Sequence, residues 1–461
     1  MRSFSLHRDN KVPMKRQLYQ IFREQILNGS MAAGEELPST REMAEQLQVS
    51  RNTVSEAYDM LITEGYVLSR QGASTRVAAG LYIQKQPQQS IVPTVKQHQP
   101  IQVDFHTGRP DLDSFPYYLW RQLLCKAADE LPKEQLGYTS PKGLLSLRTE
   151  IASWLVRSKG LLVDPQDIFI TTGATQAINL VVGLLALPGK KVVLEDPCNK
   201  GLMETFLTAG CELLPIPADR QGLRTELLED VESQAVYVTP SHQFPLGGIL
   251  PAGRRAELIR YARDQNIYLL EDDYDSEFRY TGEPVSPLYA MDSQQVIYIG
   301  TFSKVLFPAI RIGYVLLPKK LHVRWMNQRM HLDVQNPPFE QAALAEFLKT
   351  RKFDHHIRRM RKLYGERRAA LLTTLKEVFG DTWCVWGDNA GLHLAVEFEG
   401  LTFDDDFFKR CCQAGLRVAS VEQHSICKGL HQNKLLLGYG HLEPSKIREG
   451  IQLLYNLIHN P

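Results

Sequence analysis

The stretch 300–313 reads Gly-Thr-Phe-Ser-Lys-Val-Leu-Phe-Pro-Ala-Ile-Arg-Ile-Gly, and it decides the fold of most of this chain. It places Lys304 directly after two hydroxyl residues, Thr301 and Ser303, and seven residues before Arg311. The apolar run Val-Ile-Tyr-Ile that precedes it predicts a buried strand. A lysine at the end of a buried strand is costly unless its amine is used, whereas a lysine beside a surface turn needs no explanation.

The side chains of this stretch suit a particular kind of small molecule. Two hydroxyls and a guanidinium in one short loop can hold a phosphate group. An amine beside a phosphate site indicates a Schiff base between Lys304 and pyridoxal phosphate (PLP), which carries an aldehyde and a phosphate on one ring. An isolated Ser-Lys pair more often belongs to a surface turn, so this hypothesis requires the other parts of a PLP site.

Length and composition set the broad class. The chain has 461 residues and a formal net charge of +1, so we expect two or three domains and no partner class follows from charge. It lacks a long apolar run and its first residues lack a signal-peptide core, so we expect a cytoplasmic protein that does not span a membrane. The seven cysteines are scattered, which predicts free thiols and no metal site.

A Gln- and Pro-rich segment divides the chain. Residues 79–103 lack apolar periodicity and predict a linker between an N-terminal unit, 1–78, and a larger C-terminal unit, 104–461.

The larger unit alternates apolar runs with helical segments, which predicts an α/β domain with a mainly parallel sheet in a large lobe of about 150–317. A basic helical stretch at 351–368, shorter strands and a helix near 444–458 predict a smaller α+β lobe. The candidate strands of the large lobe are 168–170, 192–194, 236–238, 267–270, 296–299 and 314–317.

The N-terminal unit has the pattern of a winged helix-turn-helix. An apolar stripe over 15–28 predicts a first helix. Ser39 or Thr40 can cap a second helix, and Ser50 can cap a third after a tight turn. Residues 67–77 predict a two-stranded wing.

In such a motif the last helix lies in the major groove of DNA, with its first residues at the bases. Arginine suits guanine and asparagine suits adenine. The alternative is a solvated helix start, and ten Lys/Arg against nine Asp/Glu in 1–78 give no basic surplus. The candidate base-reading residues are Ser50, Arg51, Asn52 and Thr53, while Arg41, Arg70 and Gly72 are candidates for phosphate or minor-groove contact.

Other polar residues follow the predicted strands and could complete a PLP site. A carboxylate is needed at the pyridine nitrogen, and Asp272 follows a strand where parallel sheets place ligand groups, with Tyr274 in reach of the ring oxygen O3′. The acidic loop could instead bind a cation, and a single histidine is more often structural. Further candidates are Ala174 and Thr175 at a helix start, His242 and Gln243 in a loop after a strand, and Tyr138, which could equally be a packing residue.

These segments follow the order phosphate loop, polar loop, Asp, Lys and Arg, and from about residue 104 onward the chain resembles the fold-type-I PLP enzymes of the aspartate aminotransferase superfamily. The resemblance implies Lys304 as the Schiff-base lysine, Asp272 at the pyridine nitrogen and Tyr274 at O3′. It also implies a homodimer in which Tyr138 reaches the phosphate of the neighbouring subunit. The residues that it implies for the phosphate are Ser303, Arg311, Ala174 and Thr175.

The N-terminal unit resembles the GntR winged helix in the strings Leu-Pro-Ser-Thr-Arg-Glu-Met-Ala at 37–44 and Val-Ser-Arg-Asn-Thr-Val at 49–54. Joined to an aminotransferase-like domain, it resembles the MocR/GabR family of bacterial transcription regulators. The resemblance implies operator DNA as a partner and a small amine, an amino acid or PLP as the effector.

Two departures from the family concern the effector. Arginines that hold an effector's carboxylate are missing from the matching stretches 195–201 and 421–427, which argues against γ-aminobutyrate. Lys200 or His424 could meet an anion there, without the bidentate geometry of arginine.

Three hypotheses remain. The first is a PLP-dependent regulator in which an amine replaces Lys304 on PLP and the linker transmits the change to the winged helices. The second is an active aminotransferase whose DNA-binding unit serves autoregulation; against it, the stretch 435–439 lacks the arginine that aminotransferases commonly carry there. The third is a scaffold with a vestigial PLP site, which the intact set around Lys304 disfavours.

Overall fold

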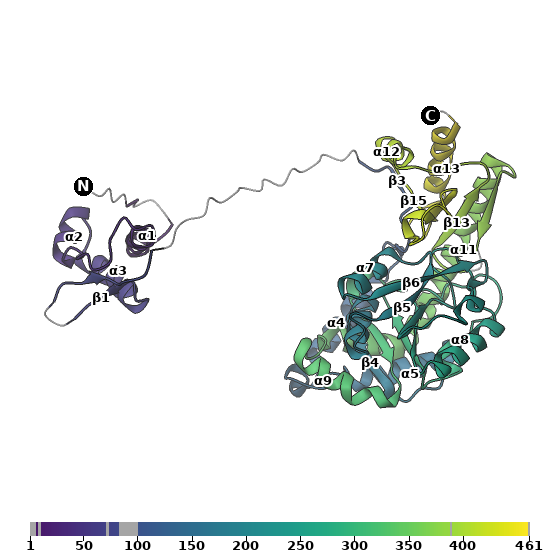
Figure 1. Ribbon diagram of the computed structural model, residues 1–461, viewed down its shortest axis with the longest axis horizontal. Helices are drawn as coiled ribbons and strands as arrows, with labels where there is room; N and C mark the ends of the chain where they lie inside the picture. The colour runs from purple at the N-terminus through teal and green to yellow at the C-terminus, as the bar shows by residue number, and fades with distance from the viewer. Residues whose placement is uncertain (1–5, 8–10, 71–72, 83–99, 388–389, 460–461) are drawn as a thin grey trace. The chain divides into compact units, whose positions relative to one another are not determined.

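The computed structural model describes residues 6–7, 11–70, 73–82, 100–387 and 390–459. It divides into two compact units, Met1–Gln97 and His98–Pro461 (Figure 1). Most of the predicted linker lies outside the described residues. No helix among the described residues has the length and apolarity needed to cross a bilayer.

The first unit is a three-helix core with a two-stranded antiparallel ribbon. Ser39 forms a capping box with Glu42 at the start of the second helix, and Gln48 adopts a left-handed conformation, φ 53°, in the turn before the third. The predicted winged helix-turn-helix is therefore confirmed. Its elements are α1 (Met14–Leu27), α2 (Thr40–Leu47), α3 (Arg51–Thr63), β1 (Val67–Leu68) and β2 (Arg76–Val77).

The second unit contains an eight-stranded sheet in the order β4-β11-β10-β9-β8-β5-β6-β7. The strands from β10 to β6 run parallel, whereas β11 is antiparallel to both neighbours and β7 is antiparallel to β6. The strand bounds are β4 (Ile168–Thr171), β5 (Lys191–Asp196), β6 (Glu212–Asp219), β7 (Gly222–Leu223), β8 (Ala235–Val238), β9 (Tyr268–Asp273), β10 (Val296–Thr301) and β11 (Gly313–Leu316).

Helices cover both faces of this sheet, because alternate residues of its strands belong to two separate apolar clusters. Val193 of β5 packs in one cluster, and its neighbours Val192 and Leu194 pack in the other. Helices α6 (Ala174–Leu184), α7 (Lys200–Thr208) and α9 (His322–Leu332) contribute to the second cluster. The first cluster receives α4 (Tyr117–Glu130), α5 (Leu145–Lys159), α8 (Ala252–Asp264), α10 (Pro338–Lys349) and α11 (Lys352–Phe379).

The small lobe is an antiparallel sheet in the order β12-β13-β16-β15, with α12 and α13 nearby (Figure 1). A short strand near the start of the unit, β3 (Val103–Asp104), pairs with β14 (Leu416–Arg417) of this lobe. The remaining bounds are β12 (Trp383–Trp386), β13 (His393–Phe398), α12 (Asp405–Gln413), β15 (Ala419–Ser420), β16 (Lys434–Gly438) and α13 (Pro444–His459).

The predicted α/β and α+β lobes are confirmed, and all six candidate strands are strands. Strand β6 escaped the sequence analysis because it is half-exposed and contains Pro215 and Pro217, which usually argue against a strand.

Candidate functional site

The third helix of the first unit begins with exposed polar residues, and one of its faces is buried in the core. Its apolar residues follow a helical spacing that packs them into the core, so the first turn faces outward. Arg51 and Asn52 are exposed there. The buried residues are Val54, Ala57, Tyr58 and Leu61.

The four predicted base-reading residues divide into two kinds. Ser50 caps the helix by accepting from the backbone N–H of Thr53, 3.1 Å away, so part of its capacity is used locally. Arg51 Nε donates to Thr40 Oγ1 at 3.3 Å, and Asn52 donates to Glu56 at 3.0 Å. Both bonds lie on the exposed surface, where they can be exchanged for bonds to DNA.

The predicted phosphate-contacting residues also lie on the surface. Arg41 is exposed at the start of α2, 3.3 Å from Glu45, and Arg70 is exposed after β1. Gly72 lies outside the described residues.

In the second unit, Lys304 follows strand β10 and is partly buried. Its Nζ donates to the carbonyl oxygen of Gly108 at 2.7 Å. Burial lowers the pKa of this amine, and the nearby carboxylates of Asp275 and Asp272 oppose that effect. A larger fraction of the amine is therefore neutral, the form that attacks an aldehyde.

Asp272 stands at the end of the adjacent parallel strand, β9, and is buried. Its Oδ2 accepts from the hydroxyl of Tyr237 at 2.7 Å, while its Oδ1 is buried without a partner among the described residues. Burial raises the pKa of Asp272 to about 6, against the opposing bond from Tyr237. A buried carboxylate oxygen without a donor can accept one from a ligand.

The acidic run at the end of β9 does not form one cluster. Glu271 accepts from the backbone N–H groups of Leu288 and Tyr289, and Asp273 accepts from Lys159 and Tyr298. Among the described residues no group of three or more His, Cys, Asp or Glu side chains could hold a metal ion.

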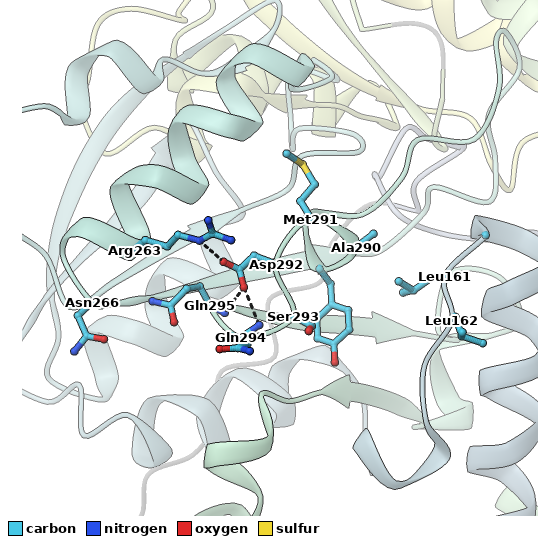
Figure 2. Close-up of a pocket in the computed structure, with 12 residues that line it drawn as sticks. Leu161, Leu162, Arg263, Asn266, Ala290, Met291, Asp292, Ser293, Gln294 and Gln295 are labelled. Atoms are coloured by element: carbon cyan, nitrogen blue, oxygen red, sulfur yellow. Dashed lines mark hydrogen bonds and ion pairs between the residues drawn. The ribbon is translucent and has the colours of Figure 1, made fainter.

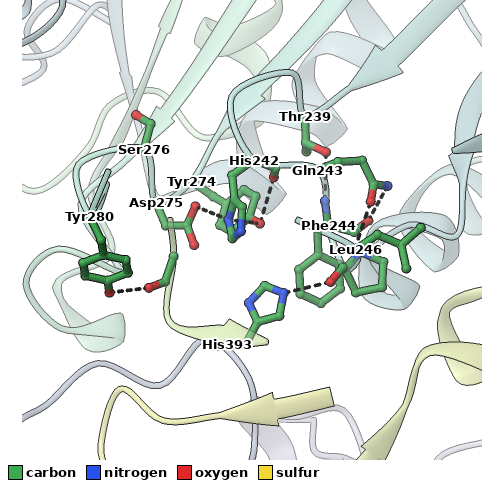
Figure 3. A network of polar contacts seen from close by, with 12 residues as sticks. Thr239, His242, Gln243, Phe244, Leu246, Tyr274, Asp275, Ser276, Tyr280 and His393 are labelled. Carbon is green, nitrogen blue, oxygen red and sulfur yellow. Dashed lines mark hydrogen bonds and ion pairs between the residues drawn. The ribbon is translucent and has the colours of Figure 1, made fainter. Parts of the chain in front are cut away.

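A polar network surrounds His242, in the loop after β8 (Figure 3). Its Nδ1 lies 2.9 Å from Asp275 Oδ1 and 2.9 Å from the hydroxyl of Tyr274, which donates to the His242 carbonyl. Its Nε2 is buried without a partner among the described residues. Gly391, with φ 84°, passes so close that a side-chain carbon there would overlap the His242 ring.

Gln243 serves its own loop. Its amide nitrogen donates to the carbonyls of Pro197 and Phe244, and its oxygen accepts from the N–H of Leu246 (Figure 3). The side chain therefore supports the shape of the loop beside His242.

An anion cradle lies at the start of α6. Gly173 caps this helix with φ 107°, and among the described residues no side chain caps the backbone N–H groups of the first turn, which begins at Ala174 and Thr175. The guanidinium of Arg311 lies against Gly173, where an added side-chain carbon would be 3.3 Å from Nη2. Exposed amides, the positive end of the helix dipole and a guanidinium suit a phosphate.

Two hydroxyls follow strand β10 immediately before Lys304. Thr301 Oγ1 lies 3.1 Å from Ser303 Oγ and accepts from the backbone N–H of Ser303. The local pair fixes the direction of both hydroxyls at the end of the strand.

Tyr138 is 93% exposed, so its ring does not pack into the core of its own chain. Its loop is anchored on both sides by Gln335, which bonds to Gly137 and Thr139. The ring is thus presented outward from a fixed loop.

The two effector candidates lie together. The backbone N–H of Lys200, at the start of α7, donates to Nδ1 of His424 at 3.3 Å. The His424 ring packs edge-on against Phe244, with ring centroids 5.0 Å apart. Burial lowers the pKa of His424 to about 4, so its imidazole is neutral near neutral pH.

Sequence reasoning missed two contributors. Tyr237 was predicted only as part of the strand 236–238, although a tyrosine hydroxyl in a buried strand needs a partner and was a usable signal. Asp196, at the end of β5, accepts from the N–H groups of Ile426 and Cys427 and so joins the large lobe to the small one. No sequence pattern predicts this contact between Asp196 and the backbone of the small lobe.

Comparison with known proteins agrees with both units. The family described as "Aminotransferase class I and II" matches residues 100–432, and "Bacterial regulatory proteins, gntR family" matches residues 14–77. A solved structure of kynurenine aminotransferase from Pyrococcus horikoshii, in complex with PMP, has a TM-score of 0.72 at 27% identity and covers 78% of this chain and 91% of that chain.

Two relatives are similar over most of the chain. The probable rhizopine catabolism regulatory protein MocR of Rhizobium meliloti is 32% identical over 97% of this chain and 94% of that protein. The pyridoxine biosynthesis transcriptional regulator PdxR of Corynebacterium glutamicum is 33% identical over 81% of this chain and 80% of that protein. The chain therefore belongs to the MocR family of transcription regulators, and it joins a GntR-type helix-turn-helix unit to an aminotransferase-like domain.

Proposed function

We propose that this regulator binds PLP through Lys304 and changes its hold on operator DNA when a small amine, an amino acid or PLP itself occupies the site. The observation that carries the proposal is the buried Oδ1 of Asp272, which has no partner among the described residues. It belongs to the strand next to the one that ends before Lys304. A protonated pyridine nitrogen is the donor that this oxygen lacks.

The chain's own residues fit the rest of the cofactor. Arg311 and the start of α6 would hold the phosphate, with Thr301 and Ser303 completing the cradle. Tyr237 orients the carboxylate of Asp272, and Asp275 orients the ring of His242. PLP supplies an aldehyde that condenses reversibly with amines. Gly108 holds the amine of Lys304 through its carbonyl until the aldehyde is present.

The effector would be read beside Phe244, where Lys200 and His424 meet. The lysine ammonium supplies a point charge for a carboxylate or another anionic group, while the neutral imidazole offers a hydrogen bond. The PdxR relative is named for pyridoxine biosynthesis and the MocR relative for rhizopine catabolism, and both names support a small-molecule signal.

The output would be DNA binding by Arg51 and Asn52 of two chains in a homodimer. The exposed ring of Tyr138 supports a dimer in which this side chain completes the partner's phosphate site. Two recognition helices related by a two-fold axis would then read two half-sites.

The direct test is a spectrum. We expect purified protein incubated with PLP to show a visible absorption band that survives dialysis, and we expect Lys304→Ala to lose it. Lys319→Ala, on a surface-exposed lysine, is the control and should keep the band. A wild-type protein that stays colourless with excess PLP would refute the cofactor proposal.

A second candidate function, catalytic transamination, is favoured by the lowered pKa of the Lys304 amine. It is tested by adding amino acids and an acceptor keto acid to the PLP-loaded protein. Many turnovers per chain would establish an enzyme, whereas a single spectral change followed by altered operator binding would establish a sensor.

A further inference from the structure

A basic hollow lies between α5, the segment 276–285 and the first half of α11. Its volume is about 330 Å³. Glu277 and Asp354 are the carboxylates among its lining residues. We call it the arginine basin and define it by its cationic lining residues, Arg157, Lys159, Arg279, Arg351, Arg358 and Arg361.

The two carboxylates of the basin, Asp354 and Glu277, already form ion pairs with three of its six cationic side chains. Asp354 is paired with both Arg157 and Arg351. Lys159 is buried against Asp273 at 2.6 Å and Glu277 at 3.4 Å.

The three remaining arginines have no carboxylate partner among the described residues. Arg361 is held by one bond, from its Nε to the carbonyl oxygen of Glu277 at 3.0 Å. Arg279 and Arg358 make no side-chain hydrogen bond to any residue that the structure describes. The basin thus carries an excess of positive charge in a confined space, and confinement strengthens its attraction for anions.

Arg279 has a hydrogen-bond donor that no described residue uses. Its Nε is buried and has no hydrogen-bond partner among the described residues. Gly282, with φ 76°, brings the backbone close to the same guanidinium, since a side-chain carbon there would lie 2.9 Å from Nη2. A buried N–H without an acceptor is costly, so an acceptor supplied by a bound molecule is expected.

A second hollow lacks this property. The hollow in Figure 2 has a volume of about 760 Å³ and contains Arg263 and Asp292. These two form an ion pair at 2.6 Å, and the other oxygen of Asp292 accepts from the backbone N–H groups of Gln294 and Gln295. In this hollow Arg263 is already paired with Asp292. We therefore do not expect it to bind an anion, although it is larger than the arginine basin.

We propose that the arginine basin binds a small phosphate-bearing molecule, at a site separate from the cradle at α6. Guanidinium groups match phosphate oxygens with paired hydrogen bonds, and three of them lack carboxylate partners. The volume is at the lower end of the range for small-molecule sites, roughly 300–1,000 Å³. A hollow of this kind suits a metabolite better than the backbone of a DNA duplex, which needs a surface rather than a pocket.

The test is calorimetric titration of the full-length, PLP-saturated protein with inorganic pyrophosphate at low ionic strength. We expect the wild type to bind and Arg279→Gln and Arg358→Gln each to weaken binding at least about tenfold, the loss of one charged hydrogen-bonding partner. Arg324→Gln, on the exposed surface of α9, removes the same charge elsewhere and should bind like the wild type. Among the described residues, Arg279 and Arg358 have no side-chain hydrogen bond or ion pair to lose, so the thermal transition of both variants should be unchanged.

One further variant separates this site from the PLP cradle. In Arg311→Gln without PLP, pyrophosphate binding should persist and should still depend on Arg279, even if the proposed cofactor binding proves wrong. The proposal is overturned if the wild type does not bind, if Arg324→Gln weakens binding equally, or if Arg279→Gln and Arg358→Gln bind normally. It is also overturned if the basin variants weaken only DNA binding, which would make this face a DNA contact.

Discussion

The start of α3 and the C-terminal edge of the large sheet carry the two sets of candidate functional residues, and they are built in opposite ways. At α3 the polar side chains are exposed and their partners are near in sequence, as with Asn52 and Glu56. At the sheet edge Asp272 and His242 are buried and bond to side chains distant in sequence, as with Asp272 and Tyr237, 35 residues apart.

This difference concerns how each region prepares for its ligand. Exposed bonds such as that of Arg51 to Thr40 exchange with water at little cost, which suits a surface that must leave and rejoin DNA. A buried oxygen such as Oδ1 of Asp272 cannot exchange its partner with water. The site therefore favours a ligand that places a hydrogen-bond donor at this one position. We therefore expect substitutions at the sheet edge to act directly on the cofactor, and on DNA only through the cofactor, whereas substitutions at α3 act directly on DNA.

The largest effect is expected from Asp272→Asn. The amide keeps the size of the side chain and can accept from Tyr237, but it brings no negative charge to a protonated pyridine nitrogen. Losing one side of a buried charged pair should weaken PLP binding about a hundredfold or more. A spectrophotometric titration with PLP measures the change.

The control for this prediction is Asp381→Asn, which removes the same charge from an exposed position of the same unit. It should leave PLP affinity unchanged, and operator affinity of the PLP-free protein should be the same for both variants. Wild-type PLP affinity in Asp272→Asn would show that the unpartnered oxygen does not serve the cofactor.

A smaller effect, confined to the other region, is expected from Arg51→Ala. Removing one base-contacting arginine should weaken operator binding about tenfold to a hundredfold, with PLP spectra unchanged. Arg16→Ala, exposed on α1, loses the same charge and serves as the control. A gel-shift titration with specific and unrelated duplexes measures both, and equal losses on the two duplexes would assign Arg51 to phosphate contact.

The same contrast explains what the sequence could predict. Helix α3 was predictable because its cap, Ser50, and its buried stripe are local patterns. Lys304 and Asp272 could be placed at one edge because parallel strands end on the same side of a sheet. These predictions needed no knowledge of which side chains touch.

The missing parts are contacts between distant segments. The carbonyl of Gly108 meets Lys304 across 196 residues, and no periodicity marks such a pair. Gln243 was predicted to be a cofactor-binding side chain from its type and position, yet sequence does not give the direction of an amide, and all of its polar atoms bond to backbone groups in and beside its own loop. The sharing of Asp354 by two arginines likewise depends on how α5 meets α11.

The smallest effect concerns pH and His424, at the contact between the large and small lobes. Its folded-state pKa of about 4 lies below the ordinary value near 6.5, so between these values the unfolded chain binds a proton that the folded chain excludes. The contribution of His424 to the free energy of unfolding of the second unit is therefore fully present above pH 6.5. It is lost as the pH falls toward 4. Because the ring is partly exposed, we expect the loss to be about 1–2 kcal/mol.

Comparison of His424→Asn with the wild type isolates this contribution, because the other histidines whose pKa is lowered by burial are present in both proteins: His356, His393, His431 and His441. Thermal unfolding of the full-length chain from pH 7 to 4.5 should show a shallower decline for His424→Asn, whereas His331→Asn, exposed on α9, should follow the wild type. An unchanged slope in His424→Asn would mean that the imidazole takes up its proton in the folded protein. The N–H of Lys200 would then face a charged ring, and the proposed neutral hydrogen-bonding role of His424 toward the effector would fail with it.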